Sequence, residues 1–171
     1  MSPLTSAATK AFVALGSNLG DSRKAVLDAM ARLQQLSYTP ILRSSLWQTS
    51  PVNCPPGSPA FVNAVVGLAP RDRETPESLL GKLRSLEEEF GRGPKQVLNE
   101  PRPLDLDLIA FGNQVSATSR LTLPHPRAHQ RRFVLAPWNE IAPAFVLPGQ
   151  TQTVAQLLAN LAADEIVKRM E

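Results

Sequence analysis

The stretch Arg102-Pro103-Leu104-Asp105-Leu106-Asp107-Leu108 predicts a β-strand with two carboxylates on one face. Successive side chains of a strand point to opposite faces, so Asp105 and Asp107 share one face while the leucines share the other. Two like charges side by side on a strand repel each other unless something positive lies between them. One interpretation is a site for Mg²⁺, which carboxylates and substrate phosphates commonly hold together, and Arg102 suits such phosphates. The alternative is an edge strand whose solvent face happens to carry two aspartates.

The segments before this strand complete an alternating series of elements. Short apolar runs predict strands over 11–15, 41–48, 61–68 and 104–111, and apolar residues at helical spacing predict helices over 22–36 and 76–90. The second helix has a strong start, since Thr75 can cap it and Pro76 suits its first position. The order β-α-β-β-α-β predicts an α+β, ferredoxin-like fold: an antiparallel sheet with both helices on one face and the other face available for loops or a ligand.

Two added C-terminal helices are expected after the last strand, around Arg127–Ala136 and from Val154 to about Met170. No repeat, low-complexity tract or linker marks a second unit, so residues 1–171 are interpreted as a single domain, expected to be a monomer. The long segments 49–60 and 91–103 are expected to be functional loops, because long loops in compact domains often are.

The composition is typical of a soluble globular protein, with 43 % hydrophobic and 19 % charged residues. No apolar run approaches the roughly 20 residues that span a bilayer, and residues 1–10 lack the basic start and apolar stretch of a signal peptide. Cys54 is the only cysteine, which excludes an internal disulfide and fits a reducing compartment. A cytoplasmic protein without a membrane segment is therefore expected.

The charge is concentrated around the two aspartates. The net charge is +3, but between Arg92 and Arg132 seven basic residues stand against three acidic ones, which gives that segment +4. A cationic zone around a carboxylate pair indicates a polyanionic ligand bound through a metal. A nucleic-acid surface would interleave basic with aromatic residues, and aromatic residues are only 5 % of the chain. No nucleic-acid partner is expected.

Two other motifs have simple interpretations. The stretch Gly16-Ser17-Asn18-Leu19-Gly20 lacks the spacing of phosphate-binding loops, so turn formation alone explains it. His125 and His129 are spaced like zinc ligands, but no third ligand is evident. His125 lies on a proline-flanked stretch near several arginines and suits phosphate contact, while His129 is interpreted as a surface residue.

Five motifs in a characteristic order point to one family. They are Ala14-Leu15-Gly16-Ser17-Asn18-Leu19-Gly20, Phe61-Val62-Asn63-Ala64, Gly91-Arg92, Pro101-Arg102-Pro103-Leu104-Asp105-Leu106-Asp107, and Leu123-Pro124-His125-Pro126-Arg127 with Arg131-Arg132-Phe133-Val134-Leu135. From about Ala11 to Pro148 the chain resembles 6-hydroxymethyl-7,8-dihydropterin pyrophosphokinase of folate biosynthesis. The resemblance implies a diphosphotransferase that moves the β,γ-diphosphoryl group of ATP to the pterin hydroxymethyl and releases AMP.

The resemblance also implies roles for individual residues. Asp105 and Asp107 would hold two Mg²⁺ ions, while Arg92 and Arg102 would offset charge on the transferring group. The ATP site would further include Glu87, Leu108, Arg120, Thr122, His125 and Arg131. The pterin site would consist of Thr49, Ser50, Val52, Phe61, Asn63 and Phe133. That set suits a flat heterocycle, because aromatic rings can stack on it and an amide can read its hydrogen-bonding edge.

The chain departs from the family pattern at three positions. Ser50 stands where proline is common, Pro94 where arginine is often found, and Asn99 where some members have tryptophan. Two other functions stay open at this point. One is a ferredoxin-like module that binds RNA on its sheet face, against which the paired aspartates count. The other is an altered paralogue that binds nucleotide or pterin without transferring a group.

Overall fold

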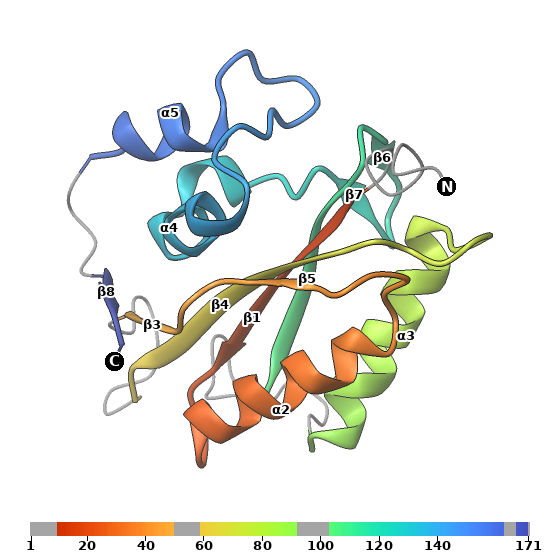
Figure 1. The fold of residues 1–171 in the computed structure, drawn as a ribbon, viewed down its shortest axis with the longest axis vertical. Coiled ribbons are helices and arrows are strands. Elements are labelled where there is room, and N and C mark those ends of the chain that lie inside the picture. The colour runs from red at the N-terminus through yellow and green to blue at the C-terminus, as the bar shows by residue number, and fades with distance from the viewer. Residues whose placement is uncertain (1–9, 50–58, 92–102, 163–166, 171) are drawn as a thin grey trace.

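The computed structural model describes residues 10–49, 59–91, 103–162 and 167–170, and an antiparallel sheet forms its centre (Figure 1). The strands follow one another across the sheet in the order β5-β1-β4-β3-β8, and β2 also pairs with β4. Their bounds are β1 (Ala11–Ser17), β2 (Leu42–Arg43), β3 (Trp47–Thr49), β4 (Phe61–Leu68), β5 (Asp105–Phe111) and β8 (Val167–Arg169). The first strand lies between β4 and β5, as the βαββαβ order requires, so the predicted ferredoxin-like fold is confirmed.

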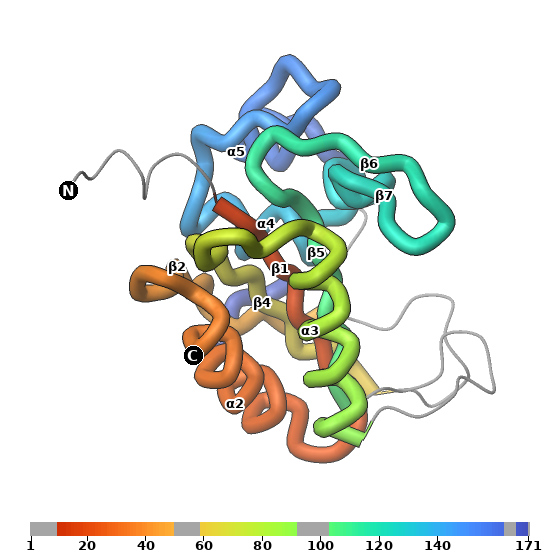
Figure 2. The backbone as a smooth tube through the Cα atoms, turned by 90° about the vertical axis from the view of Figure 1, so that its right-hand side faces the viewer, coloured from red at the N-terminus to blue at the C-terminus, as the bar shows by residue number. Residues whose placement is uncertain are grey.

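Two helices, α2 (Ser22–Gln34) and α3 (Pro76–Glu89), cover one face of the sheet (Figures 1 and 2). Their apolar side chains pack on residues of β1, β4 and β5 in one core. Asp21 caps α2, since its carboxylate accepts the Lys24 N–H at 3.1 Å. Both helices were predicted, and each ends within two residues of its predicted end.

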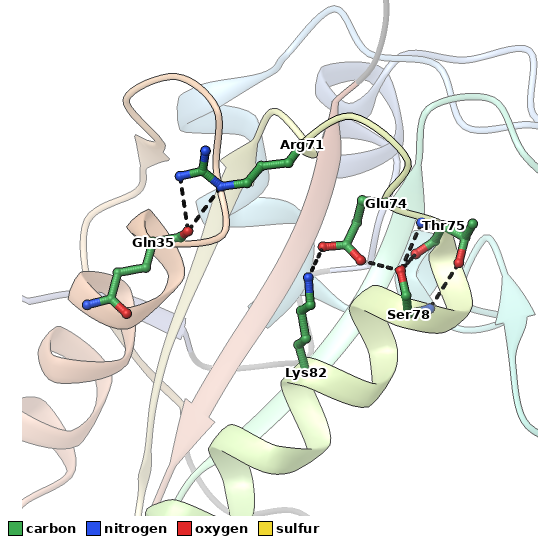
Figure 3. A network of polar contacts seen from close by, with 6 residues as sticks. All are labelled: Gln35, Arg71, Glu74, Thr75, Ser78 and Lys82. Carbon is green, nitrogen blue, oxygen red and sulfur yellow. Dashed lines mark hydrogen bonds and ion pairs between the residues drawn. The ribbon is translucent and has the colours of Figure 1, made fainter.

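The start of α3 is fixed by a network of polar side chains (Figure 3). Thr75 and Ser78 form a capping box, in which the Thr75 hydroxyl accepts the Ser78 N–H at 3.1 Å and the Ser78 hydroxyl accepts the Thr75 N–H at 2.9 Å. Glu74 accepts hydrogen bonds from the Ser78 hydroxyl and from Lys82 Nζ. The backbone N–H groups of Thr75 and Ser78, at the start of the helix, thereby have partners, which explains why the helix begins where its sequence predicts.

The opposite face of the sheet is not left free, and this prediction is wrong in part. Helix α4 (Arg132–Ile141) packs on it and α5 (Val154–Ala159) packs on α4, and both contribute to a second core with Phe12, Val65 and Ile109. The ring of Phe12 lies 5.3 Å from that of Trp138, centroid to centroid. The strands carry apolar side chains on both faces, in the first core on one and in the second core on the other, so helices cover both faces.

The predicted helix from Val154 to about Met170 is also wrong. Helix α5 ends at Ala159, and Val167–Arg169 form β8, which pairs with Trp47–Thr49 of β3. The Met170 N–H donates to the Leu46 carbonyl at 2.8 Å. Pairing with the exposed edge of β3 satisfies backbone groups that a longer helix would leave open to water.

Three smaller differences concern irregular segments. The predicted strand over 41–48 is two strands, because the Ser44 hydroxyl accepts the Val65 N–H and the Glu140 carboxylate accepts the Ser45 N–H. The helix expected around 127–136 is a 3-10 turn, Ala128–Gln130, followed by α4. A short hairpin of β6 (Ser116–Ala117) and β7 (Thr122–Leu123) was not predicted. In the described part of the chain, none of the helices has the length and apolar character needed to cross a membrane.

Candidate active site

The two aspartates lie on one face of β5, as the alternation of the sequence predicts. Asp105 pairs with Gly16 and Asp107 with Ala14 of β1, and both aspartates are half-buried. The intervening Leu106 is 0 % exposed and belongs to the core under α2 and α3. β5 is at one edge of the sheet that the structure describes, but its aspartates share their face with residues of the second core. The alternative of an edge strand with two aspartates on a solvent face is met only in part, because β5 is an edge strand of the described sheet but both aspartates are half-buried.

The carboxylate of Asp107 is unusual in its protonation. Burial, and then the neighbouring charge of Asp105, raise the pKa of Asp107 to about 7, and Glu87 adds to this effect. Arg84 and Arg131 act in the opposite direction. Such a carboxylate is poorly stabilised as an anion in the protein alone, and a cation beside both aspartates would remove that cost.

A row of paired residues runs across the sheet from Asp105 to the uncharged side chains of Asn63 and Trp47. Asp105 pairs with Gly16, Gly16 with Asn63 of β4, and Asn63 with Trp47 of β3. Directly paired residues of an antiparallel sheet point to the same face, so these four positions form one line across four strands. The line joins a charged end at β5 to an amide and an aromatic ring at the other end.

Gly16 keeps the middle of this row open. A Cβ atom at Gly16 would lie 3.2 Å from Asn63 Oδ1 and 3.7 Å from the Phe61 ring. The Asn63 amide is held from its other side, because Nδ2 donates to the Thr49 hydroxyl at 2.5 Å. Thr49 and Asn63 are both buried. The structure therefore brings Thr49, Phe61 and Asn63 together, three of the residues expected at the pterin site.

His125 approaches the aspartates from the segment after β7. The backbone N–H of His125 donates to the Ile109 carbonyl at 3.0 Å, which attaches this segment to β5. Its Nδ1 accepts the Arg127 N–H at 3.1 Å, so a neutral imidazole carries its proton on Nε2. Burial, and then Arg131 and Arg127, lower the pKa of His125, which favours that neutral form at pH 7.

Arg131 and Phe133 stand together at the start of α4. The Arg131 guanidinium lies over the Phe133 ring, 5.5 Å from its centroid. This cation–π contact couples a residue expected at the ATP site with one expected at the pterin site. Both side chains are half-buried, so each retains surface for a ligand.

The other expected site residues are placed less directly. Arg120 and Thr122 are exposed at the hairpin of β6 and β7. The Leu108 side chain packs in the core on the face opposite the aspartates, and Glu87 is buried on α3. Ser50, Val52, Arg92 and Arg102 lie outside the described residues.

The end of β1 and the residue after it have a role that the interpretation of Gly16–Gly20 as a simple turn missed. The buried Ser17 hydroxyl donates to the Pro103 carbonyl at 2.7 Å, just before β5. The buried Asn18 amide donates to the Pro59 carbonyl at 3.4 Å, just before β4. These side chains fix the chain where it enters the two strands of the site. The family motif Ala14–Gly20, which contains both residues, was the signal that pointed to this segment.

The described residues fit a magnesium ion only in partnership with a ligand. Among the residues that the structure describes, no group of three or more His, Cys, Asp or Glu side chains is arranged to hold a metal. Two carboxylates on one face supply hard oxygen donors, and Mg²⁺ typically takes its other ligands from phosphates and water. The donor set therefore suits a metal that arrives with a nucleotide.

Comparison with known proteins gives consistent results. Residues 12–143 match the family model of 7,8-dihydro-6-hydroxymethylpterin-pyrophosphokinase. The 2-amino-4-hydroxy-6-hydroxymethyldihydropteridine pyrophosphokinase of Haemophilus influenzae is 35 % identical over 92 % of this chain and 96 % of its own length. The enzyme of the same name from Synechocystis is 38 % identical over 88 % of this chain and 75 % of its own length.

Solved structures support the fold. A triple mutant of HPPK-DHPS from Plasmodium falciparum aligns with a TM-score of 0.67 at 13 % identity. The alignment covers 88 % of this chain and 41 % of that longer one. At this identity the likeness concerns the fold alone.

Proposed function

The chain belongs to the 7,8-dihydro-6-hydroxymethylpterin-pyrophosphokinase family, and on that premise we propose that it transfers a diphosphoryl group from ATP to the pterin. The hydroxymethyl oxygen attacks the β-phosphorus of ATP, and the bond between that phosphorus and the α,β-bridging oxygen breaks. The β,γ-diphosphoryl group moves to the pterin, AMP leaves, and the hydroxyl proton passes to solvent. The product is the pterin diphosphate of folate biosynthesis.

The observation that carries this proposal is the row Asp105–Gly16–Asn63 across three strands. The reaction joins a highly charged triphosphate to a flat, neutral heterocycle, so the site needs an anion-binding end beside an apolar, hydrogen-bonding end. The row has the apolar, hydrogen-bonding end, and its carboxylate end can bind the triphosphate through the proposed Mg²⁺. The glycine between the two ends adds no side chain there. Phe61, Asn63, Thr49 and Phe133 are the described residues proposed to bind the pterin, by stacking and hydrogen bonds.

At the charged end, Asp105 and Asp107 are proposed to hold two Mg²⁺ ions with the nucleotide. Bound Mg²⁺ would neutralise negative charge on the phosphate oxygens. His125 can donate from Nε2 to a phosphate oxygen while staying neutral, and Arg131 adds a charged donor. Arg120, Thr122 and Leu108 remain predicted to border the nucleotide.

Arg92 and Arg102, which lie outside the described residues, are proposed to act on the transferring group. Arg92 closely follows α3 and Arg102 closely precedes β5, so both belong to the segment that leads into the Asp105 strand. Charged donors placed where negative charge develops lower the barrier of group transfer. Ser50 and Val52, also outside, are proposed to complete the pterin site. The same proposal includes a monomeric enzyme in the cytoplasm, which gel filtration and cell fractionation test.

The nucleotide product tests the reaction. Purified protein is incubated with ATP, Mg²⁺ and 6-hydroxymethyl-7,8-dihydropterin, and the nucleotides are separated by chromatography. We expect AMP in equal amount to the pterin diphosphate. Pterin-dependent ADP without AMP would mean attack at the γ-phosphorus. Binding of both ligands without any product would indicate the altered paralogue instead.

A further inference from the structure

At the outer edge of β5, two side chains of α3 bond to the backbone, and the proposed function assigns them no role. The Leu106 N–H and C=O bond to side chains of α3, so by the alternation of a strand the backbone groups of Asp105 and Asp107 point toward β1. In an antiparallel pair the residue between them turns its N–H and C=O the other way. Leu106 therefore presents both groups at the edge of the described sheet, where α3 lies beside β5 (Figure 2).

Two residues of α3 take the place of a neighbouring strand. The Leu106 N–H donates to Glu87 Oε2 at 2.8 Å, and the Leu106 carbonyl accepts from Arg84 Nη1 at 2.9 Å. Arg84 Nη1 also donates to Glu87 Oε1 at 2.8 Å. The three contacts close a ring of side chains and backbone around one residue. The pair thus satisfies both backbone groups of Leu106.

The burial of the Glu87 side chain restrains this arrangement. The Glu87 side chain is 4 % exposed, while that of Arg84 is 48 % exposed. A buried carboxylate is tolerated only when hydrogen bonds and an opposite charge compensate it, so Glu87 is tied to this geometry. The Leu106 side chain is itself fully buried in the core. Leu106 is therefore fixed both by its side chain and by its backbone.

We infer that Glu87 and Arg84 are positioning residues, which fix the Leu106 backbone and thereby hold Asp105 and Asp107 in the geometry that a Mg²⁺–nucleotide complex requires. The inference rests on the proposed function of the two aspartates. It gives Glu87 a role behind the site, different from the direct nucleotide contact that the family resemblance implies. Groups that orient metal ligands from behind typically affect metal affinity or activity by about tenfold to a hundredfold when they are removed.

Mn²⁺ binding separates positioning from simple charge. The affinity of Mn²⁺ is measured by electron paramagnetic resonance on protein loaded with α,β-methylene-ATP. Removal of the Glu87 charge would weaken cation binding by electrostatics alone, whereas removal of the Arg84 charge would strengthen it. Positioning predicts that both Glu87→Ala and Arg84→Ala weaken Mn²⁺ binding, by about tenfold or more for Glu87→Ala. Glu87→Gln, which keeps an acceptor for the Leu106 N–H, should recover part of the loss.

Three further measurements define the mechanism. Affinity for the analogue in EDTA should stay within twofold in Glu87→Ala, because positioning acts on the metal ligands and not on the nucleotide. The Leu106 amide should exchange faster in Glu87→Ala. In steady-state kinetics, kcat should fall while KM for the pterin stays unchanged.

Two control variants of α3 account for less specific effects. Glu88→Gln removes a neighbouring charge at an exposed position, and Thr75→Ala removes the cap at the start of the helix. Both should bind Mn²⁺ like the unaltered protein, although Thr75→Ala should be less stable. Equal weakening in Thr75→Ala would assign the effect to loss of helix stability and overturn the inference.

The outcomes distinguish this inference from the proposed function. Tighter Mn²⁺ binding in Arg84→Ala, or unchanged binding in both Arg84→Ala and Glu87→Ala, would overturn the positioning role. If Asp105→Asn and Asp107→Asn lose Mn²⁺ while the α3 variants do not, the metal site stands and only the positioning role fails. If the aspartate variants also keep Mn²⁺, the proposed function itself is wrong.

Discussion

Replacement of Asp107 by asparagine is expected to stabilise the metal-free protein at neutral pH. Burial and the charge of Asp105 raise the pKa of Asp107 to about 7, with a further contribution from Glu87 of α3. Arg84 of α3 and Arg131, which precedes α4, only partly offset these effects. Asparagine keeps the shape of the side chain and removes the charge, so the variant is free of this electrostatic cost.

The size and the pH range of the effect follow from the two pKa values. The folded protein holds the Asp107 proton up to a pH of about 7, whereas an unfolded chain releases it near 3.8. Between these values the folded state binds more protons, so the free energy of unfolding falls as the pH rises. The interval corresponds to about 4 kcal/mol, at about 1.4 kcal/mol for each pKa unit. The stabilisation by Asp107→Asn should therefore be near zero at pH 4 and approach a few kcal/mol at pH 8.

Urea unfolding in EDTA, followed by circular dichroism from pH 4 to pH 8, measures this difference. Other groups, His125 among them, titrate in both proteins, so the quantity of interest is the variant minus the unaltered protein. Asp72→Asn serves as the matched control, because Asp72 is exposed. Its free energy of unfolding should differ from that of the unaltered protein by less than about 0.5 kcal/mol at every pH.

Ligands should reverse the order of stability. With Mg²⁺ and α,β-methylene-ATP the unaltered protein gains stability through binding to its folded state, and Asp107→Asn should gain less. Equal stability of the two proteins at pH 8 in EDTA would show that Asp107 is well accommodated as an anion, and the argument from repulsion would be refuted. A larger gain in the variant would refute the assignment of Asp107 to the metal.

Three other substitutions test separate parts of the site. Gly16→Ala should weaken binding of a fluorescent pterin by roughly tenfold, about 1.4 kcal/mol, because its Cβ would displace the Asn63 amide, and unchanged binding would argue against that location of the pterin. Arg92→Ala and Arg102→Ala should lower kcat by about two to three orders of magnitude with little change in KM for ATP. A change in KM alone would mean that these arginines bind ATP without stabilising the transition state. Thr75→Ala should lower the free energy of unfolding by about 1 kcal/mol in denaturant titrations and leave kcat unaltered, since the cap is at the opposite end of α3 from Glu87. A loss of kcat would contradict that separation.

The elements that could be predicted from the sequence are those specified by local pattern. Alternating leucine and aspartate determine both the strand at Asp105 and the face that its carboxylates occupy, because the period of a strand is two residues. The start of α3 was equally predictable, since Thr75 and Pro76 act within one turn. In both cases the residues that form the structure are neighbours in the sequence.

The errors arise where distant segments compete with local preference. The segment of β8 follows a helix-forming stretch, and its strand conformation depends on pairing with Trp47–Thr49, more than a hundred residues earlier. The cover of the second face by α4 likewise involves contacts between residues far apart in the sequence, such as Phe12 and Trp138. No local pattern encodes such contacts, and tertiary pairing overrides propensity in short segments.

The candidate site shows the same division at the level of single residues. The aspartates were accessible from spacing, whereas the pterin residues came only from family resemblance. Arg84 could not have been found, since a basic and an acidic residue three apart on a helix are usually an exposed ion pair of small effect. Only the register of β5 against β1 reveals that this pair binds the backbone between the two aspartates.

The features that break local rules are concentrated around the same short section of the sheet. Two carboxylates repel each other on β5, Glu87 is a buried acid, and Gly16 weakens a central strand. Each would be unfavourable alone, but the core around Leu106 fixes the strand of the carboxylates and the Arg84 guanidinium compensates the Glu87 charge. Strain kept in this way by a rigid surround is typical of functional sites. Since the same carboxylates are expected to destabilise the empty protein and to bind the metal, ligand binding should relieve the cost where it arises.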